Sequence, residues 1–472
     1  MTFLLSLALL CAAGLALLDL ARLRTGSWPG DLGLAWFTGG AWFALGAAAA
    51  RFLAGVPYTR ATALIVVAAP VGAWAAVRAR RPAASEAPEV RTARWMPRPR
   101  WLFAALAAYV AAVTIAVALH GFNTPTQTDD GLRVRAYAPV VAWRDAWPDA
   151  ARDLLVTAGA VPAYVPTLGW RLSGGLDQFH ANYAVLAGLL ALLLVVVGTA
   201  SARGAPERGW ASAFAVLSLP LFVYHCTQTY ADAVLAMHAG AAFVFALEHA
   251  RTRDPADAAR ALLLLAAAWM VKREGEIVAA TAAALLVAQI LWVAARAGAP
   301  VPRRLAWLAA PVLAYAAIRI SAVGPARAFP LLSLLAARPA APAAAAVQAP
   351  GALGAASVFA RAVLDTGNAG MLFWVLPAAA AARWRLLATP ACAWPLAWPV
   401  ALFAESALSS IWLIPEYTIN AGTVNRSLFA ASVTGALWVG ALLTERAPEV
   451  APAAAGSSHG ARRRRKRPGR RP

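Results

Sequence analysis

YAVLAGLLALLLVVVGTA, residues 183–200, has the length and composition of a membrane-spanning helix. It contains no charged side chain, and its length is close to the roughly 20 apolar residues that an α-helix needs to cross about 30 Å of hydrocarbon. Similar runs recur from residue 3 to residue 443, and 61% of the 472 residues are hydrophobic while 14% are charged. One water-soluble core could not bury that much apolar surface. The sequence therefore predicts an all-α polytopic membrane protein.

The hydropathy pattern predicts a bundle of about 11–13 transmembrane helices. One of the candidate ranges, 261–271, is too short to cross a bilayer alone. The thirteen ranges are 3–20, 34–55, 61–77, 101–120, 183–200, 210–224, 233–250, 261–271, 277–295, 305–323, 370–382, 386–408 and 428–443.

The loops between these ranges alternate in basic content. One alternate set carries 28 of the 42 Lys and Arg residues, whereas the other set carries 14, together with 12 acids. Since Arg-rich loops face the cytoplasm, we expect a cytoplasmic C-terminus, an N-terminus outside and an outer loop at 121–182. We expect a multi-pass protein of the bacterial plasma (inner) membrane with its active site facing outside.

Loop composition also predicts the domain organisation. Residues 1–77 are expected to form an N-terminal three-helix membrane module, and the basic, Pro-rich segment 78–100 a cytoplasmic linker. Residues 101–445 would form the main membrane domain. The segment 446–472 combines a Pro, Ala, Gly and Ser-rich stretch with RRRRKR at 462–467, so we expect a disordered basic tail that attracts anionic lipid head groups. No nucleic-acid-binding motif is present in the sequence, and no nucleic-acid partner is expected.

The cysteines and histidines do not form a metal signature. Cys11, Cys226 and Cys392 lie in or beside apolar runs without CxxC spacing, which excludes a disulfide framework and a structural zinc site. His225 and His238 flank a single Asp, which is not a metal-ligand pattern. We therefore expect no cofactor. The sequence neither requires nor excludes a divalent cation.

The outer loop begins with two adjacent carboxylates, Asp129 and Asp130, and Tyr137 follows closely. An Asp at a membrane boundary can act as a general base toward a hydroxyl, because burial and a neighbouring charge raise its pKa toward working pH. A structural alternative is that Thr128 or Asp129 caps a following helix.

Further along this loop, the segment 138–159 predicts an amphipathic helix that lies flat in the outer interface. Within this segment, Pro148 suits a first helical position and Gly159 a C-terminal cap. The pattern places an apolar face, Trp143, Trp147 and Leu154, opposite an acidic face, Asp145, Asp149 and Asp153. We interpret the three carboxylates as solvated rather than catalytic.

Tyr230 and Asp232 open a helix that starts from the outer side. An acid at a helix N-terminus is stabilised by the helix dipole, by about 0.3–1 kcal/mol, which is one sufficient explanation. The alternative is that this Asp binds the acceptor or serves as a second carboxylate of a site.

The range 261–271 follows the basic loop 251–260, and the range 277–295 leads into the basic loop 296–304. Because both basic loops are expected on the same side of the membrane, the two ranges must form a hairpin. Its outer tip carries Lys272, Arg273, Glu274 and Glu276. Charges at the tip of a hydrophobic hairpin are unfavourable unless they are paired, hydrated or functional. Adjacent Lys and Arg side chains can hold a phosphate, and the alternative is snorkelling with local ion pairing.

Arg426 is the only basic residue between Arg385 and Arg446, and it precedes the last membrane range. A lone Arg at the outer start of a helix suits a second phosphate contact. The alternative is a plain interfacial anchor.

Together these segments resemble the GT-C superfamily of integral-membrane glycosyltransferases, which includes protein O-mannosyltransferases, aminoarabinose transferases and rhizobial core transferases. TDDGLRVRAYAPVVAW at 128–143 is similar to the family's outer-loop Asp motif, with Asp130 on that Asp. TYADAVLA at 229–236 looks like its "YaDlplA", and WMVKREGEIV at 269–278 like its "tKxEGl". TVNRSLF at 423–429 is similar to the start of its last helices.

The resemblance implies a GT-C-like bundle over residues 101–443 and an inverting transfer of a hexose or pentose. The donor would be a polyprenyl-phosphate-linked sugar, and the acceptor a hydroxyl on a periplasmic or extracellular lipid, glycan or protein. Asp130 would be the general base, although the family's Trp before this Asp is Asp129 here, which leaves the choice between the two open. The remaining site residues implied as substrate-binding are Tyr137, Tyr230, Asp232, Lys272, Arg273, Glu274 and Arg426, of which the cationic ones would stabilise the departing phosphate.

Two other classes of function remain as alternatives. A secondary transporter or lipid flippase would be expected to carry charged or broken helices at mid-membrane depth. Asp19 is the main acid deep in a predicted span, and it lies near the inner end beside Arg22, which disfavours transport. A non-enzymatic scaffold would require the outer carboxylates to be fully paired with arginines.

Overall fold

The computed structural model describes residues 2–80, 100–123, 137–176, 179–228, 230–297, 303–329, 352–410 and 427–445. Within these ranges 86% of the residues are helical and no strand occurs. Eight helices in the described ranges are long and apolar enough to cross a membrane. The prediction of an all-α, multi-pass membrane protein is confirmed at this level.

Each of the thirteen predicted membrane ranges coincides with helix. The eight long helices are α1 (Thr2–Leu20), α2 (Trp28–Phe52), α3 (Arg60–Arg80), α4 (Arg100–Asn123), α8 (Phe179–Ala202), α11 (Ala231–Thr252), α13 (Gly275–Ala297) and α21 (Pro390–Leu408). The shorter elements are α9 (Pro206–Leu217), α10 (Pro220–His225), α12 (Pro255–Trp269), the 3₁₀ helix η2 (Arg303–Leu308), α14 (Ala309–Val323), α15 (Pro325–Ala328), α17 (Ala352–Leu364), α18 (Thr366–Ala369), α19 (Leu372–Ala382), α20 (Trp384–Leu387) and α23 (Phe429–Thr444).

Proline explains why the predicted range 210–224 is divided between two helices. The range 210–224 becomes α9 and α10, and the break falls just before Pro220. Proline has no backbone N–H and disfavours helical geometry at the preceding residue. Leu219 accordingly has a ψ of 98°.

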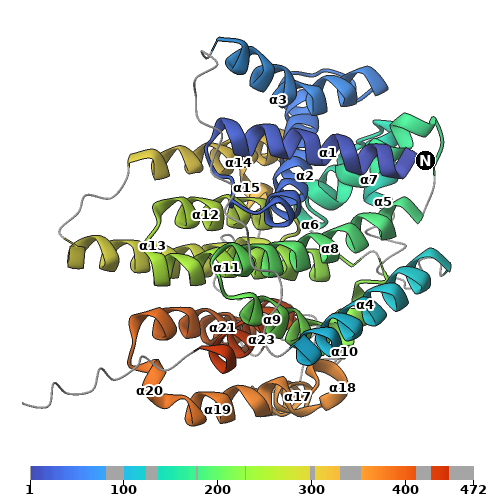
Figure 1. Cartoon of the computed structure of the whole chain (residues 1–472). Coiled ribbons are helices and arrows are strands. Elements are labelled where there is room, and N and C mark those ends of the chain that lie inside the picture. Colours follow the sequence, from blue (N-terminus) through green and yellow to red (C-terminus); the bar gives the residue numbers. More distant parts are fainter. Residues whose placement is uncertain are drawn as a thin grey trace, which may run out of the picture.

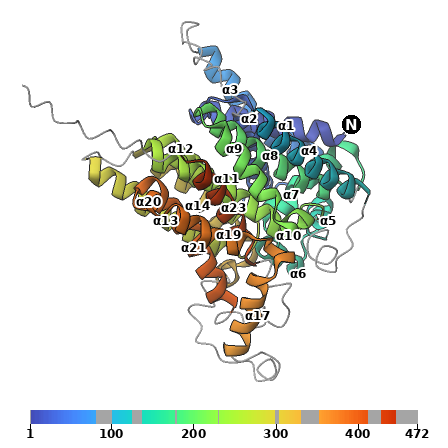
Figure 2. The ribbon, with the colours of Figure 1, turned by 60° about the horizontal axis from the view of Figure 1, so that its bottom comes forward.

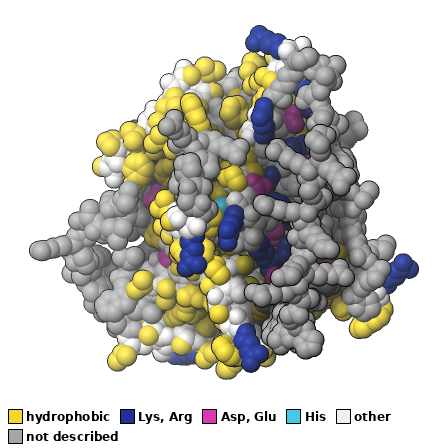
Figure 3. Space-filling view, turned by 60° about the vertical axis from the view of Figure 1, so that its left-hand side comes forward, with side chains coloured by type: hydrophobic (Ala, Val, Ile, Leu, Met, Phe, Trp, Pro, Cys, Tyr) yellow, Lys and Arg dark blue, Asp and Glu magenta, His cyan; other side chains and the backbone are white. Residues whose placement is uncertain are grey.

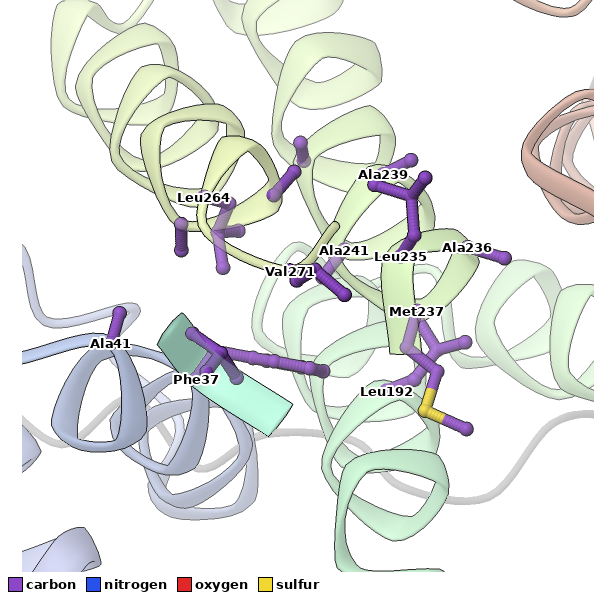
Figure 4. Close-up of a cluster of buried hydrophobic side chains, with 14 of the residues drawn as sticks. Phe37, Ala41, Leu192, Leu235, Ala236, Met237, Ala239, Ala241, Leu264 and Val271 are labelled. Carbon is purple, nitrogen blue, oxygen red and sulfur yellow. The ribbon is translucent and has the colours of Figure 1, made fainter. Parts of the chain in front are cut away.

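The long helices lie side by side, with α11 at the centre (Figure 1). In α11, 89% of the membrane window is buried, as expected for a helix surrounded by other helices. Figure 4 shows Met237 of α11 near Phe37 of α2 and Leu192 of α8 within the hydrophobic core. In Figure 2, α3 and α17 lie at opposite margins of the bundle.

The first two helices pack with their backbones in close contact. A Cβ atom on Gly39 of α2 would lie 1.9 Å from the carbonyl oxygen of Leu10, and one on Gly14 of α1 would lie 2.0 Å from that of Ala35. Small residues at helix interfaces allow this approach in membrane bundles. α2 also packs against α8, so these helices share the core with the rest of the chain.

The described part of the segment 121–182, which the sequence predicts to be the outer loop, contains α5 (Tyr137–Arg144), α6 (Asp149–Thr157) and α7 (Ala160–Ser173). The single interfacial helix predicted over 138–159 is therefore wrong in extent. Asp145 has a φ of +52° and ends the first helix, while Gly159 has a φ of +77° and precedes α7 rather than only capping α6. Pro148 is the residue before α6 and not its first residue.

The acidic face of that segment is partly paired. Asp145 Oδ1 lies 2.8 Å from Arg51 Nε at the end of α2, which corrects the interpretation of this carboxylate as solvated. Asp149 has a side chain that is 90% exposed, in line with a solvated role. Trp147 is buried, and it packs edge-on against Phe52, so the tryptophan belongs to the protein core rather than to a lipid interface.

The ion pairs in the described residues join only loops that the basic alternation assigns to the same side. Arg51 with Asp145 and Arg327 with Asp153 connect elements of the outer set, whereas Arg203 with Asp257 connects elements of the Arg-rich set. Figure 3 views the Arg-rich end from the left-hand side of Figure 1 and shows charged side chains gathered between hydrophobic areas. The bundle thus has two separate charged ends.

Candidate functional site

The hairpin predicted from the sequence is present, and its tip lies at the end of the bundle that carries the outer loop. α12 ends at Trp269 and α13 begins at Gly275, so residues 270–274 form the turn. A Cβ atom on Gly275 would lie 2.4 Å from the carbonyl oxygen of Ala268. A glycine at this position lets the two helices approach closely enough to place the charged tip against α11.

Lys272 forms a buried ion pair at this tip. Its Nζ atom lies 2.5 Å from Asp232 Oδ1 and 3.2 Å from Glu274 Oε2. Lys272 and Asp232 are only 8% and 5% exposed. The two predicted site residues are 40 positions apart in sequence, and the structure brings them into direct contact.

Arg273 and Glu274 connect the tip to the outer loop. Arg273 Nη2 lies 3.7 Å from Glu274 Oε1, and the Arg273 backbone N–H donates to the carbonyl oxygen of Thr157 at the end of α6. Burial raises the pKa of Glu274, but the positive charges of Lys272 and Arg273 outweigh it and hold that pKa below its usual value. Glu274 is therefore an anion at neutral pH and contacts both cations.

Glu276, in the first turn of α13, is paired with Arg319 of α14. Arg319 is 1% exposed, and its guanidinium carbon lies 5.6–5.8 Å from the ring centres of three aromatic residues, Trp269, Tyr315 and Phe329. Aromatic faces stabilise such a cation. The sequence interpretation did not include Arg319 in the site, although it is the only charged residue in the range 305–323.

Glu405 of α21 adds a residue from a fourth helix to the charged residues around the hairpin tip. It lies within electrostatic range of both Lys272 and Glu274, and Ser409 Oγ donates a hydrogen bond of 3.0 Å to its Oε1 atom. It too is the only charged residue of its predicted range, 386–408. We call the seven charged residues the tip cluster: Asp232, Lys272, Arg273, Glu274, Glu276, Arg319 and Glu405.

Tyr230 lies beside the cluster as the residue that precedes α11. Its ring stacks on His225 with 4.2 Å between centroids, and His225 also contacts Phe429 edge-on at 4.8 Å. The turn between α10 and α11 further buries Thr227 and Gln228. This buried polar turn was not predicted as part of the site. Its signal in the sequence is the run of polar residues in YHCTQTYAD, 224–232.

The remaining predicted site residues do not enter this geometry. Tyr137 begins α5 and is 48% exposed. Asp129, Asp130 and Arg426 lie outside the described residues. Ser427, the residue after Arg426, is described, and its carbonyl oxygen accepts a hydrogen bond of 2.9 Å from Ser406 Oγ of α21.

Within the described ranges, no group of three or more His, Cys, Asp and Glu residues is arranged to hold a metal ion. The carboxylates of the tip cluster instead face cations: Asp232 and Glu274 contact Lys272, and Glu276 contacts Arg319. Three cations, Lys272, Arg273 and Arg319, thus lie among four carboxylates, Asp232, Glu274, Glu276 and Glu405. An anionic substrate can bind here only by taking the place of a carboxylate partner at one of these cations.

The chain matches no protein-family model, no curated protein and no solved structure.

Proposed function

We propose that this protein is a glycosyltransferase of the GT-C type. It would transfer a sugar from a polyprenyl-phosphate-linked donor to a hydroxyl acceptor at the outer face of the bacterial plasma membrane. The observation that carries the proposal is the buried contact of Lys272 with Asp232 and Glu274 at the outer-loop end of a membrane bundle. Ionisable residues placed in such bundles are unfavourable unless they serve a function.

The cations of the tip cluster support an anionic, lipid-linked donor. Arg273 is 29% exposed and reaches Glu274 only at 3.7 Å, so its guanidinium is the most accessible cation of the tip. A lipid phosphate could replace part of the contact between the tip cations and Glu274. The charge on this phosphate grows as its bond to the sugar breaks, and fixed cations then stabilise the transition state more than the ground state.

The proposed reaction is a single inverting displacement. The acceptor oxygen attacks the anomeric carbon, the bond between that carbon and the phosphate oxygen breaks, and the acceptor proton passes to an aspartate. We propose Asp130 or Asp129 as this general base. Arg426, together with Lys272 and Arg273, would hold the leaving phosphate, while Tyr137, Tyr230, Asp232 and Glu274 would contact the substrates. The reaction needs no resident cofactor.

The connection between the tip and the outer loop supports the same assignment. The hydrogen bond from the Arg273 backbone to Thr157 ties the hairpin tip to α6, and α6 belongs to the loop that begins with Asp129 and Asp130. Loop residues held by a rigid scaffold are a common location for catalytic groups. The proposed base and the proposed phosphate site would thus share one supporting structure.

A secondary transporter or flippase is the alternative that one observation favours. Lys272 and Asp232 form a buried ion pair, and the half-buried Glu405 of α21 lies within electrostatic range of Lys272; charged groups inside membrane bundles also occur on ion pathways. A transporter would move its solute without cleaving a sugar–phosphate bond.

The test is to incubate membranes that contain the protein with a panel of polyprenyl-phosphate sugars and to measure release of the lipid phosphate. We expect release with at least one donor, and none with membranes that lack the protein. Uptake of a labelled solute into vesicles without any lipid-linked sugar, and without phosphate release from any donor, would favour the transporter instead.

A further inference from the structure

Two apolar cavities lie side by side between α12 and α14. The larger has a volume of about 680 Å³ and is bordered by α12, α13, η2 and α14. The smaller has a volume of about 390 Å³ and is bordered by α1, α2, α12 and α14. Ala266 and Leu308 border both cavities, so these two side chains form the wall between them.

The two cavities run in the same direction. Along α12 the larger cavity is bordered from Leu262 to Trp269, and the smaller one from Leu263 to Met270. Seven residues of α-helix correspond to a length of about 10 Å. Both cavities therefore extend in parallel from the outer-loop end of α12 into the bundle.

The lining of the two cavities favours hydrocarbon as the occupant. Apart from Glu276, Thr281 and Thr38, the lining of the two cavities is apolar. Water does not occupy an apolar cavity favourably, and an empty cavity destabilises a protein in proportion to its volume. Around a membrane bundle, the available hydrocarbon is the acyl chains of lipids.

A buried cation, Arg319, lies behind Trp269 and Phe329 at the outer-loop end of the larger cavity and borders neither cavity itself. Arg319 contacts the ring of Trp269, which lines the cavity, and its Nη1 atom is paired with Glu276. In the part of the chain that the structure describes, Arg319 Nε and Nη2 have no hydrogen-bond partner. Buried donors without acceptors are unfavourable, and phosphate or ester oxygens are the acceptors that a guanidinium binds best.

We propose that this site binds one two-chain membrane phospholipid. Each cavity would take one acyl chain. The rings of Trp269 and Phe329 would move aside on binding, so that Arg319 donates to the oxygens of the phosphate or of the ester groups. Two parallel cavities separated by a wall suit two chains better than a single polyprenyl chain. The lipid would complete the contact of α14 with the bundle, and the proposal does not depend on the glycosyltransferase function.

The experiment measures the lipids that stay with the full-length protein after purification in detergent and extensive washing. Extraction and mass spectrometry should find about one diacyl phospholipid per chain. The Leu308→Trp variant, which fills the space next to the dividing wall, should retain several-fold less. The matched control is Leu313→Trp, at a position on α14 that is 67% exposed, and it should retain as much lipid as the unmodified protein.

Arg319→Gln should also lose the lipid, and Arg319→Lys should recover part of it, because a lysine keeps the positive charge. If Arg319→Gln does not fold, Leu308→Trp and Ala266→Phe carry the test alone. Equal diacyl phospholipid in Leu308→Trp and the unmodified protein would overturn the proposal. Retention of a polyprenyl phosphate in place of a diacyl phospholipid would overturn it as well. Sugar transfer is measured separately, so loss of transfer with full lipid retention would count only against the proposed enzyme function.

Discussion

Lys272 of the hairpin tip lies 2.5 Å from Asp232 in the first turn of α11, and both side chains are buried. The helix dipole at the start of α11 already stabilises the carboxylate, and the ammonium adds a direct partner. This contact fixes the position of the hairpin tip, because it joins the α12–α13 hairpin to α11, the central helix of the bundle.

Removing one partner of this pair should destabilise the protein. Lys272→Met or Asp232→Asn leaves the other group buried with fewer compensating charges, which costs about 3–5 kcal/mol in such cases. Thermal unfolding of the purified protein measures the effect. The control is Arg327→Met, because the Arg327 side chain is 63% exposed in its pair with Asp153, and the expected change there is within about 0.5 kcal/mol. Equal stability of Lys272→Met and the control would show that the buried pair is not formed.

The contribution of Glu274 to stability should depend on pH. Lys272 and Arg273 hold its folded-state pKa below the ordinary value of 4.5, so its ionised form contributes stability above that value, and the contribution is lost as pH falls through the folded pKa. Glu274→Gln should therefore lower the unfolding temperature most at pH 7. The difference should shrink once the pH falls below about 4.5. A difference that grows toward acid pH would contradict the ion pairs at the tip.

The orientation of the bundle can be tested with single cysteines. Asp149 and Arg385 are both exposed, and they belong to opposite loop sets. Asp149→Cys should react with a membrane-impermeant maleimide on intact cells, whereas Arg385→Cys should react only after permeabilisation. Cys11, Cys226 and Cys392 are buried and provide an unreactive background. The reverse labelling pattern would place the tip cluster on the cytoplasmic side and remove the basis for an outward-facing site.

The cations assigned to the phosphate should act on the donor rather than on the acceptor. Arg273→Ala and Arg426→Ala should raise KM for the polyprenyl-phosphate sugar by about tenfold or more, since one charged hydrogen bond contributes roughly 1.5–3 kcal/mol. KM for the acceptor should change little. Arg327→Ala removes an arginine from the same end of the bundle and serves as the control. Equal losses for donor and acceptor would contradict the phosphate role.

The sequence predicted the helices well because membrane spans are long, apolar and uncharged, so that each of the thirteen ranges coincides with helix. It failed for α7, whose Pro162, Pro166 and Gly169 are typical of a loop. Burial against α2 stabilises this helix, and burial by a distant segment leaves no local signal. The amphipathic helical segment predicted within 138–159 is interrupted for a related reason, since Asp145 leaves helical geometry while pairing with Arg51.

The candidate site was predicted in part. Hairpin geometry alone indicated that the tip charges gather at one end, but the partners of these charges come from other helices. The contact of Lys272 with Asp232, the pairing of Glu276 with Arg319, and the approach of Glu405 all depend on tertiary packing. Arg319 and Glu405 could have been noticed as lone charges in otherwise apolar ranges, which is a signal of function in membrane helices.

The most direct test of the enzyme function compares release of lipid phosphate by the unmodified protein with release by Asp130→Asn, Asp129→Asn and the control Asp149→Asn. We predict that one of the first two variants folds normally and loses at least about 100-fold in rate, since general-base catalysis contributes about 10²–10⁴-fold, while Asp149→Asn keeps the full rate. Full activity in both Asp130→Asn and Asp129→Asn would contradict the account.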